Sequence, residues 1–174
     1  MKVAVPRETF PGERRVALVP ASVPNLLKAG LEVCVETGAG AQAGFLDAEY
    51  EQRGATIGVN RIATFAEADV VLQVRCLGAN PVEGREDLRM FRSGQVVIGG
   101  SDPLGNPQAA QEIAETGASL FALELVPRIT RAQAVDILSS MATIADYRSV
   151  LLAALHSPQM LPMFSYAAGM LNPA

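Results

Sequence analysis

Short apolar runs recur along the chain, and polar or amphipathic stretches separate them. Runs of this length with turn residues at both ends are typical of β-strands. The run Val70–Val74 is almost continuously apolar, as expected for a central parallel strand that is buried on both faces. The pattern predicts about six strands, at Val3–Val5, Leu31–Glu36, Ala55–Val59, Val70–Val74, Gln95–Gly99 and Leu120–Leu123.

The stretches between these runs have the spacing of short helices. Gly30 and Gly54 follow two of them and are suited to the position just after a helix end. We expect helices at Ala21–Ala29, Asp47–Arg53, Arg85–Phe91 and Gln108–Thr116. Strands that alternate with helices are joined by right-handed crossovers. The sequence therefore predicts an α/β fold, an open and mostly parallel sheet with flanking helices in a Rossmann-like or flavodoxin-like three-layer arrangement.

A much longer helix is predicted near the end of the chain, from Ala132 to about Leu155, with a broad apolar face. A helix of this length can cross to a second domain or pack against another subunit. We therefore divide the chain into an α/β domain, residues 1–130, and a long crossover helix with its connector, residues 131–174. The connector includes a second apolar stretch, Met163–Leu171.

Composition narrows the class of protein. Hydrophobic residues make up 49% of the 174 residues and charged residues 18%, which suits a globular domain with a real core. The net charge of −4 argues against a nucleic-acid partner. The longest apolar run, Val150–Leu155, is far shorter than a membrane-spanning helix, so we expect no direct membrane insertion.

The cysteines and the histidine suggest no metal chemistry. Cys34 and Cys76 lack the spacing of a metal or redox pair, and the chain opens on a strand rather than a signal peptide. We expect both thiols to be reduced in a cytosol-like compartment. His156 is the one histidine, which excludes a site with several histidine ligands. We assign it no chemistry.

A glycine motif, Gly38–Gly44, follows the predicted strand Leu31–Glu36 and has the form GxGxxxG. Glycines there can let a backbone approach a pyrophosphate. The context argues against this function, because the third glycine does not lie in a long helix. The acidic residue expected about 20 positions later is also missing. We predict a plain loop, so the chain has no dinucleotide fingerprint of its own.

Polar chemistry is concentrated in the segment Leu123–Ser140, which reads LELVPRITRAQAVDILSS. The apolar run before it ends at Pro127, which cannot donate to a strand ladder. The polar residues that follow then lie between a strand end and a helix start, where open α/β sheets bind ligands. From the residues alone, a capped helix with solvated arginines is an equal alternative.

This segment resembles the nicotinamide-facing segment of the NAD(H)-binding subunit of proton-translocating transhydrogenase, a PRISRAQ-type sequence followed by D-x-L-S-S. Three further stretches resemble the same family, with its relative alanine dehydrogenase. They read VPRETFPGERRVALVP from Val5 to Pro20, VETGAGAQAGFLDAEY from Val35 to Tyr50, and ADVVLQVR from Ala68 to Arg75. The resemblance covers essentially the whole chain in the expected order.

The resemblance implies a set of site residues for NAD(H). Arg128, Gln133 and Asp136 are expected to act in catalysis, and the cofactor contacts are expected from Arg128, Ile129, Thr130, Gln133, Asp136 and Ser139. On a helix, Gln133, Asp136 and Ser139 would share roughly one face. We also expect Arg128 to pair with Asp136 while the site is empty and to move to the ligand when it fills.

The resemblance also implies partners. The complete complex moves hydride from NADH to NADP, coupled to proton movement in separate membrane subunits. This chain would be the first domain of the alpha subunit, would need a dinucleotide-binding domain that follows it, and would be inactive alone. The implied partners are the NADP-binding and membrane subunits and a second copy in a homodimer. The implied location is cytoplasmic, peripheral to the inner membrane through those subunits.

The chain departs from the family at two positions of the long helix. Met141 stands where the family usually has Gln, and Asp146 where it usually has Gly. A diverged or partly disabled copy is therefore one possible interpretation.

Two arginines are candidates for a second, substrate-binding pocket. Arg15 follows a glycine-containing loop, and Arg75 ends the strand Val70–Val74. In alanine dehydrogenases the residue matching Arg15 holds the substrate carboxylate, and a catalytic Lys matches Arg75. Those enzymes also have a His after the next strand, where this chain reads Gly100-Ser101-Asp102-Pro103. An arginine cannot act as a base near neutral pH, because the pKa of its guanidinium lies far above neutral.

Two alternatives to a transhydrogenase domain stay open at this point. One is an amino-acid oxidoreductase similar to alanine dehydrogenase, against which the missing Lys and His argue. The other is a non-catalytic module that dimerises and binds a small ligand at Arg15 and Arg75.

Overall fold

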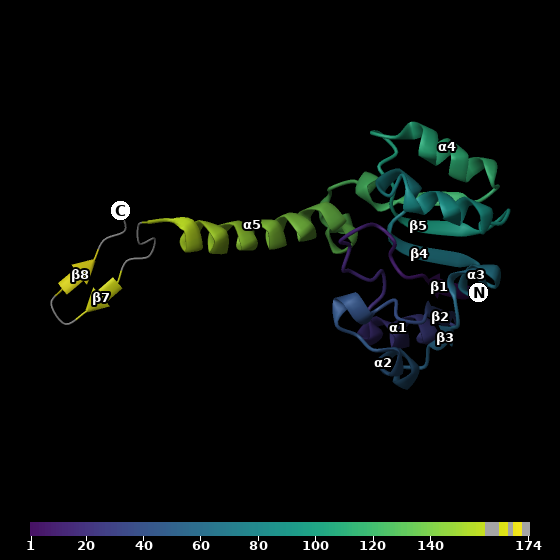
Figure 1. Ribbon diagram of the computed structural model, residues 1–174, viewed down its shortest axis with the longest axis horizontal. Helices are drawn as coiled ribbons and strands as arrows, with labels where there is room; N and C mark the ends of the chain where they lie inside the picture. Colours follow the sequence, from purple (N-terminus) through teal and green to yellow (C-terminus); the bar gives the residue numbers. More distant parts are fainter. Residues whose placement is uncertain (159–163, 167–168, 172–174) are drawn as a thin grey trace. The chain divides into compact units, whose positions relative to one another are not determined.

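The computed structural model describes residues 1–158, 164–166 and 169–171, and it divides the chain into two compact units (Figure 1). Unit 1 comprises Met1–Val126, and unit 2 comprises Pro127–Ala174. The rest of the predicted connector lies outside the described residues. Each unit is described by itself below.

Unit 1 is built on a six-stranded sheet in which each neighbouring pair of strands is parallel. The strands are β1 (Lys2–Val5), β2 (Glu32–Glu36), β3 (Thr56–Gly58), β4 (Val70–Arg75), β5 (Val96–Gly100) and β6 (Ser119–Ala122). They lie in the order β3-β2-β1-β4-β5-β6. The chain first moves outward from β1 to β3 and then returns to β4, so the order reverses between β1 and β4. Open α/β sheets bind ligands beyond the strand ends at such a point.

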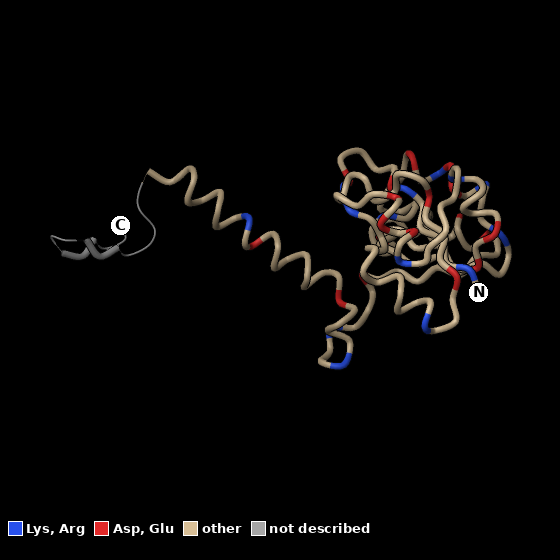
Figure 2. The backbone as a smooth tube through the Cα atoms, turned by 90° about the horizontal axis from the view of Figure 1, so that it is seen from below, with Lys and Arg blue, Asp and Glu red and all other residues tan. Residues whose placement is uncertain are grey.

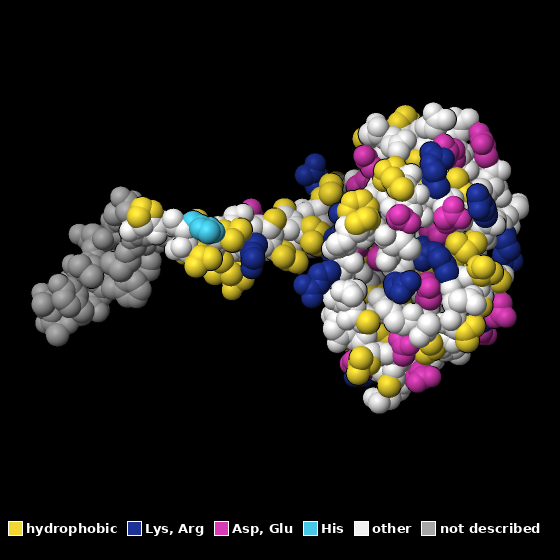
Figure 3. Space-filling view, in the orientation of Figure 1, with side chains coloured by type: hydrophobic (Ala, Val, Ile, Leu, Met, Phe, Trp, Pro, Cys, Tyr) yellow, Lys and Arg dark blue, Asp and Glu magenta, His cyan; other side chains and the backbone are white. Residues whose placement is uncertain are grey.

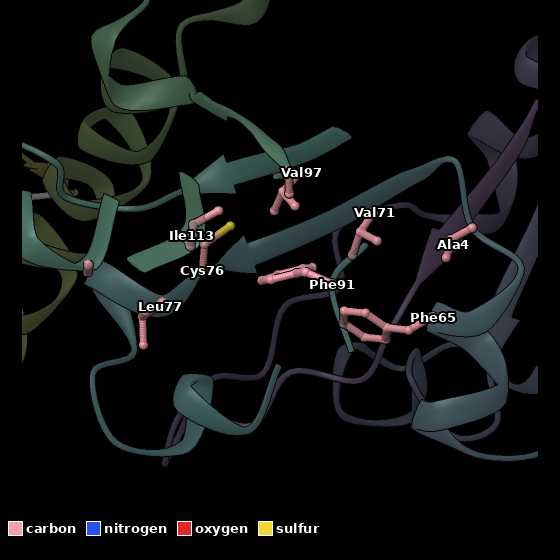
Figure 4. Close-up of a cluster of buried hydrophobic side chains, with 11 residues drawn as sticks. Ala4, Phe65, Val71, Cys76, Leu77, Phe91, Val97 and Ile113 are labelled. Carbon is pink, nitrogen blue, oxygen red and sulfur yellow. The ribbon is translucent and has the colours of Figure 1, made fainter. Parts of the chain in front are cut away.

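Two hydrophobic clusters cover the two faces of this sheet. Ala4 belongs to one cluster and its neighbour Val5 to the other, because successive side chains of a strand point to opposite faces. Phe65 and Ile113 bring α3 (Arg61–Ala66) and α4 (Pro107–Glu115) onto the first face (Figure 4). The second face packs against α1 (Val23–Lys28) and α2 (Asp47–Gln52). The predicted three-layer α/β fold is therefore confirmed.

Three elements of unit 1 differ from the prediction. The helix α3 was not predicted, because it buries only Thr64 and Phe65 and so has little apolar periodicity. The predicted helix Arg85–Phe91 is instead a 3-10 helix, η4 (Glu83–Arg89). The strand predicted at Leu120–Leu123 ends one residue earlier, where the 3-10 turn η5 (Leu123–Leu125) begins. Short 3-10 turns η1 (Pro20–Ser22), η2 (Ala41–Ala43) and η3 (Leu77–Ala79) complete the unit.

Other local predictions agree with the structure. The glycine motif forms a loop with the turn η2, and Gly38 and Gly44 have the left-handed backbone that glycine adopts readily (φ of 73° and 90°). Cys34 and Cys76 are buried and free. Cys76 belongs to the hydrophobic cluster on the first face, and neither cysteine forms a disulfide.

Unit 2 contains the 3-10 helix η6 (Thr130–Val135), the helix α5 (Ile137–His156) and a two-stranded antiparallel pair, β7 (Phe164–Tyr166) and β8 (Gly169–Leu171). The prediction that the long helix begins at Ala132 is wrong. Asp136 has an extended backbone (φ −79°, ψ 99°) that interrupts the helical path, and α5 begins at the next residue.

The helix α5 has an unusual surface. Its charged residues are Asp146 and Arg148 near its middle (Figure 2), and apolar side chains lie along it (Figure 3). Several of these are more than half exposed, including Ile144, Tyr147, Val150 and Leu155. Among the described residues, no helix combines the length and the apolar character that crossing a bilayer requires.

Candidate functional site

The polar segment of unit 2 forms a hollow of about 420 Å³. The residues that line it come from three short stretches: the turn before η6, η6 itself and the first turns of α5. They are Arg128, Gln133, Asp136, Ser139, Ser140 and Thr143. Four of the six cofactor contacts predicted from the sequence therefore face one space. The other two, Ile129 and Thr130, do not line it.

Asp136 closes the start of α5. One carboxylate oxygen, Oδ1, accepts hydrogen bonds from the backbone N–H groups of Leu138 (2.9 Å) and Ser139 (3.1 Å). The other, Oδ2, accepts from the Ser139 hydroxyl at 2.6 Å. These are the contacts of an N-cap, which satisfies amides that have no partner within the helix. The Ser139 hydroxyl is the main reason that the pKa of Asp136 is lowered.

This geometry corrects two expectations. Gln133, Asp136 and Ser139 do not share a helix face, because Gln133 lies in η6 and Asp136 is the cap between the two helices. Nor do Arg128 and Asp136, both well within the described part of the chain, form an ion pair. The Asp136 carboxylate already accepts three hydrogen bonds at the helix start, and the charge of Arg128 acts on it only as a minor influence.

Arg128 and Gln133 are the side chains of the hollow with unused hydrogen-bonding capacity. Neither forms a side-chain hydrogen bond or ion pair with another residue in the part of the chain that the structure describes. The Ser139 and Ser140 hydroxyls, in contrast, donate to Asp136 or to backbone carbonyls of the same helix turn. A ligand entering the hollow would therefore meet a guanidinium and a carboxamide first. Met141 and Asp146, the two departures from the family, do not line the hollow.

A second polar cluster lies in unit 1, at the point where the sheet order reverses. It brings together Arg15, from the loop after β1, and Arg75, the last residue of β4. Both guanidinium groups bind the same carboxylate, that of Glu13. Arg15 donates from Nε to Oε1 (2.7 Å) and from Nη2 to Oε2 (2.6 Å), and Arg75 donates from Nε to Oε2 (2.9 Å). The two arginines chosen from the sequence therefore lie in one cluster, and their role in binding a substrate stays a prediction.

The electrostatics of this cluster follow from burial and pairing. The Glu13 side chain is 5% exposed, and its hydrogen bonds from Arg15, with those from Arg75, lower its pKa to about 2. Glu8 accepts from the backbone N–H groups of Val74 (2.7 Å) and Arg75 (3.1 Å), yet burial raises its pKa above the ordinary value. The Arg75 guanidinium also lies over the Phe10 ring, 4.4 Å from its centre.

A buried network holds the loop that carries these residues. Arg61 donates from Nε and Nη2 to the two oxygens of Asp87, each at 2.7 Å, and from Nη1 to the backbone carbonyl of Arg7 at 2.6 Å. Gln73 donates to Asp87 at 2.7 Å. The backbone N–H of Arg7 donates in turn to Glu36. The loop after β1 is thereby fixed to α3, β2 and η4.

Sequence reasoning missed Glu8, Glu13 and Arg61. A signal for the first two was present, since both acids stand in the same short loop as Arg15. No local pattern could identify Arg61, because its partners come from distant parts of the chain.

Comparison with known proteins gives consistent results. The profile of the family described as alanine dehydrogenase/PNT, N-terminal domain, matches residues 4–145. The chain is 40% identical over 174 residues to NAD(P) transhydrogenase subunit alpha of Cereibacter sphaeroides, a match that covers 100% of this chain and 32% of that protein. It is 34% identical over 174 residues to the subunit of the same name from Haemophilus influenzae, again over 100% of this chain and 32% of that protein. The chain thus spans about a third of the length of these relatives.

Two solved structures have the same fold. The transhydrogenase from Sinorhizobium meliloti has 42% sequence identity and a TM-score of 0.85, over 98% of this chain and 49% of that one. An L-alanine dehydrogenase has 27% identity and a TM-score of 0.77, over 89% of this chain and 40% of that one.

Proposed function

Because the chain belongs to the alanine dehydrogenase/PNT N-terminal domain family, we propose that it is the first domain of a transhydrogenase alpha subunit and that its Arg128–Ser139 segment receives the nicotinamide end of NAD(H). The observation that carries this proposal is the hollow in unit 2. Arg128, Gln133, Asp136 and Ser139 line it together, although they are spread over twelve positions, from the turn before η6 to the first turn of α5.

Two observations favour a transhydrogenase over an alanine dehydrogenase. The likeness to transhydrogenases is closer, with 42% identity to one solved structure against 27% for the other. In addition, Arg75 replaces the catalytic Lys of alanine dehydrogenases, and the segment after β5 carries no His. A guanidinium has no lone pair to accept a proton, and that of Arg75 is bound by Glu13, so it offers no general base for an amino acid.

The residues of the hollow fit the nicotinamide end of the cofactor. A carboxamide both donates and accepts hydrogen bonds, and Gln133 can do the same in return. Arg128 offers donors to a carboxamide or phosphate oxygen. When bound, NAD(H) supplies the hydride. Direct transfer between two nicotinamide rings needs position and electrostatics but no general base at the carbon. The task of this chain is then to hold and orient one ring.

Asp136 acts in this proposal as a positioning residue. Its carboxylate fixes the first turn of α5, and that turn carries Ser139 and Ser140 along the wall of the hollow. The cap therefore sets the distance between the free donors of η6 and the hydroxyl groups of α5. We expect its loss to disturb the geometry of the hollow rather than to remove a contact with the cofactor.

In this proposal, other domains and subunits bind the rest of the cofactor and carry out the remaining steps of the reaction. We propose that a dinucleotide-binding domain completes the subunit, and that NADP-binding and membrane subunits accept the hydride and move protons. The same proposal places the domain in the cytoplasm, beside the membrane that holds its partners. The exposed apolar side chains of α5 are consistent with cover by a further domain or by a second copy. The homodimer stays a prediction.

The first test is an NADH titration followed by nucleotide fluorescence. We expect the 174-residue chain to show no saturation below about millimolar NADH, and the full-length subunit to bind in the micromolar range. In the full-length subunit, Arg128→Ala and Gln133→Ala should each lower hydride transfer by about tenfold or more. Arg131→Ala is the matched control, since Arg131 lies in η6 but does not line the hollow.

Two results would contradict the proposal. Micromolar binding by the isolated chain would mean that another site, such as the loop Gly38–Gly44, holds the cofactor. If Arg128→Ala transferred hydride as fast as Arg131→Ala, the hollow would have no part in the reaction. The coding sequence after Ala174 is a further check, because the proposal requires a G-x-G-x-x-G strand–turn–helix unit there.

A further inference from the structure

Two buried oxygen atoms just beyond β5 and β6 have no hydrogen-bond partner among the described residues. One is the hydroxyl oxygen of Ser101, which directly follows β5, and the other is the carboxylate oxygen Oε2 of Glu124, in η5. Ser101 is 0% exposed, and neither of the two oxygens is open to solvent. Buried polar atoms without a partner are rare in folded proteins, and an internal water molecule or ion is a recurrent explanation for them.

The two unpaired oxygens lie on either side of an existing hydrogen bond. The backbone N–H of Ser101 donates to the other carboxylate oxygen of Glu124, Oε1, at 2.7 Å, and the N–H of Asp102 donates to the same atom. The Ser101 hydroxyl belongs to the same residue as the first of these N–H groups, and Oε1 and Oε2 share one carbon atom. A single small molecule can therefore contact both unpaired oxygens.

The backbone around Ser101 has little freedom to bring the two oxygens into direct contact. The Gly100 carbonyl, next to Ser101, accepts a hydrogen bond from the N–H of Cys76 at 2.7 Å. Gly78, in η3, lies so close to the Ser101 carbonyl that a side chain at this position would collide with it. The Ser101 backbone is thus held by η3 on one side and by Glu124 on the other, so a partner for the two oxygens has to lie between them.

The chemistry of the two groups selects the kind of molecule that binds. A carboxylate oxygen accepts hydrogen bonds, so the bound molecule must donate one to Oε2, whereas the Ser101 hydroxyl can either donate or accept. An anion would meet the carboxylate of Glu124. A metal ion needs several further ligands, and the described residues contain no group of three or more acidic, cysteine or histidine side chains that could hold one. We propose that one internal water molecule binds between Ser101 and Glu124, donating to Oε2 and hydrogen bonding to the Ser101 hydroxyl.

This water molecule gives the loop after β5 a second connection to η5. The first connection is direct, through Oε1 of Glu124 and the backbone of Ser101 and Asp102. A water-mediated hydrogen bond is enthalpically nearly as favourable as a direct one, and the ordering of one water molecule costs little entropy. The inference does not depend on the proposed function, since Ser101 and Glu124 belong to unit 1 and the hollow to unit 2.

Magnetic relaxation dispersion of the water oxygen nucleus tests this proposal in solution. Its amplitude counts the water molecules that stay in the protein longer than the protein tumbles, and exchange of the serine hydroxyl proton does not contribute to it. In Ser101→Val, methyl groups replace the hydroxyl and occupy its space, so the amplitude should fall by the equivalent of one water molecule. Ser119→Val is the matched control, because Ser119 is exposed on β6 and its replacement should leave the amplitude unchanged.

The Glu124→Gln variant distinguishes a water molecule from a cation. Its amide oxygen must take the place of Oε1, which accepts from two backbone N–H groups, so its NH₂ group takes the place of Oε2. A water molecule can accept from this group and should be retained, whereas a cation should be lost. Replacement of sodium chloride by ammonium chloride should likewise leave the amplitude of the natural chain unchanged. If Ser101→Val does not fold, a crystal structure of the natural chain should show a water molecule within hydrogen-bond distance of both oxygens.

Three outcomes would overturn the proposal. Equal amplitudes for the natural chain and Ser101→Val would mean that no long-lived water molecule binds at Ser101. Loss of the signal in Glu124→Gln, or its change in ammonium chloride, would assign the site to a cation. A crystal structure in which the Ser101 hydroxyl donates directly to Oε2 of Glu124 would show that the two groups need no molecule between them.

Discussion

Removal of the Arg61 guanidinium should destabilise unit 1 more than most other single changes at its surface. The side chain is 17% exposed and its partner Asp87 is 4% exposed. In Arg61→Met, Asp87 keeps only the donor from Gln73, and the carbonyl of Arg7 loses its partner. Removing one member of a buried ion pair costs about 3–5 kcal/mol, because the other charge stays buried without compensation.

Urea unfolding measures this loss. The chain has no tryptophan, so we would follow near-UV circular dichroism from Tyr50, which is 0% exposed, while Tyr147 is 68% exposed and contributes little. With a slope of about 2 kcal/mol per molar urea, the midpoint should fall by about 1.5–2.5 M. A second change, Asp87→Asn, should restore part of the stability of Arg61→Met, since the buried charge is then gone.

The matched control is Arg89→Met. Arg89 pairs with Glu86 at 3.3 Å, but the two side chains are 80% and 67% exposed. Exposed pairs of this kind contribute about 0–1 kcal/mol, so this variant should unfold almost like the natural chain. A loss below about 1 kcal/mol for Arg61→Met, or equal losses for the two variants, would refute the claim that the network holds unit 1 together.

Three more predictions follow from single contacts. The pKa of Glu13 is about 2 in the folded chain and lies near 4.5 without its partners, so the stability from its ion pairs is complete above that range and is lost as the pH falls from about 4.5 to about 2. The shift corresponds to at most about 3 kcal/mol, less the screening at half-exposed Arg15, and acid titration of Glu13→Gln should lack this step. Tyr50→Phe removes a buried hydrogen bond to the Leu18 carbonyl (2.8 Å) and should cost about 1–2 kcal/mol in urea unfolding. Asp136→Ala removes the cap of α5, so amide hydrogen exchange should speed up in its first turn while the last turn is unchanged.

Each of these has a result that would count against it. An acid step of the same size in Glu13→Gln would assign that step to other carboxylates. A Tyr50→Phe variant as stable as the natural chain would mean that water replaces the hydroxyl. Uniform exchange along α5 in Asp136→Ala would mean that the helix start is held by something other than the cap.

The layered fold could be predicted because the strands of the sheet carry their own signal. The run that forms β4 is apolar at nearly every position, and β1, β2 and β5 are nearly as clear. The helix α3 has no such apolar pattern. Its apolar residues do not all face the core, since Ile62 is 70% exposed. The start of α5 was misplaced because Ala132 to Val135 favour a helix on their own. Only the side chain of Asp136, turned back onto the first amides, shows where the long helix begins.

Only part of each candidate site could be predicted from the sequence. Arg15 could be chosen because it follows a glycine-containing loop and precedes an apolar run, and Arg75 because it ends the apolar run Val70–Val74. Their shared partner, Glu13, could not be predicted, because no local sequence pattern shows that its carboxylate contacts both guanidinium groups. The hollow residues were identified by resemblance, and their arrangement around a cap rather than along one helix face required coordinates.

The loop after β1 also bears on how the protein folds. Three of its attachments join Glu8 to Val74, Glu13 to Arg75 and Thr9 to Asn80, across 66, 62 and 71 positions of the chain. Closing such long segments is slow and lowers the conformational entropy of the chain. A single hydrogen bond or ion pair contributes too little free energy to offset that cost. The strands β1 and β4 must therefore pair before these contacts are worth forming. The arginine cluster should assemble last on the folding pathway, so that a partly folded chain presents Arg15 and Arg75 as separate surface charges.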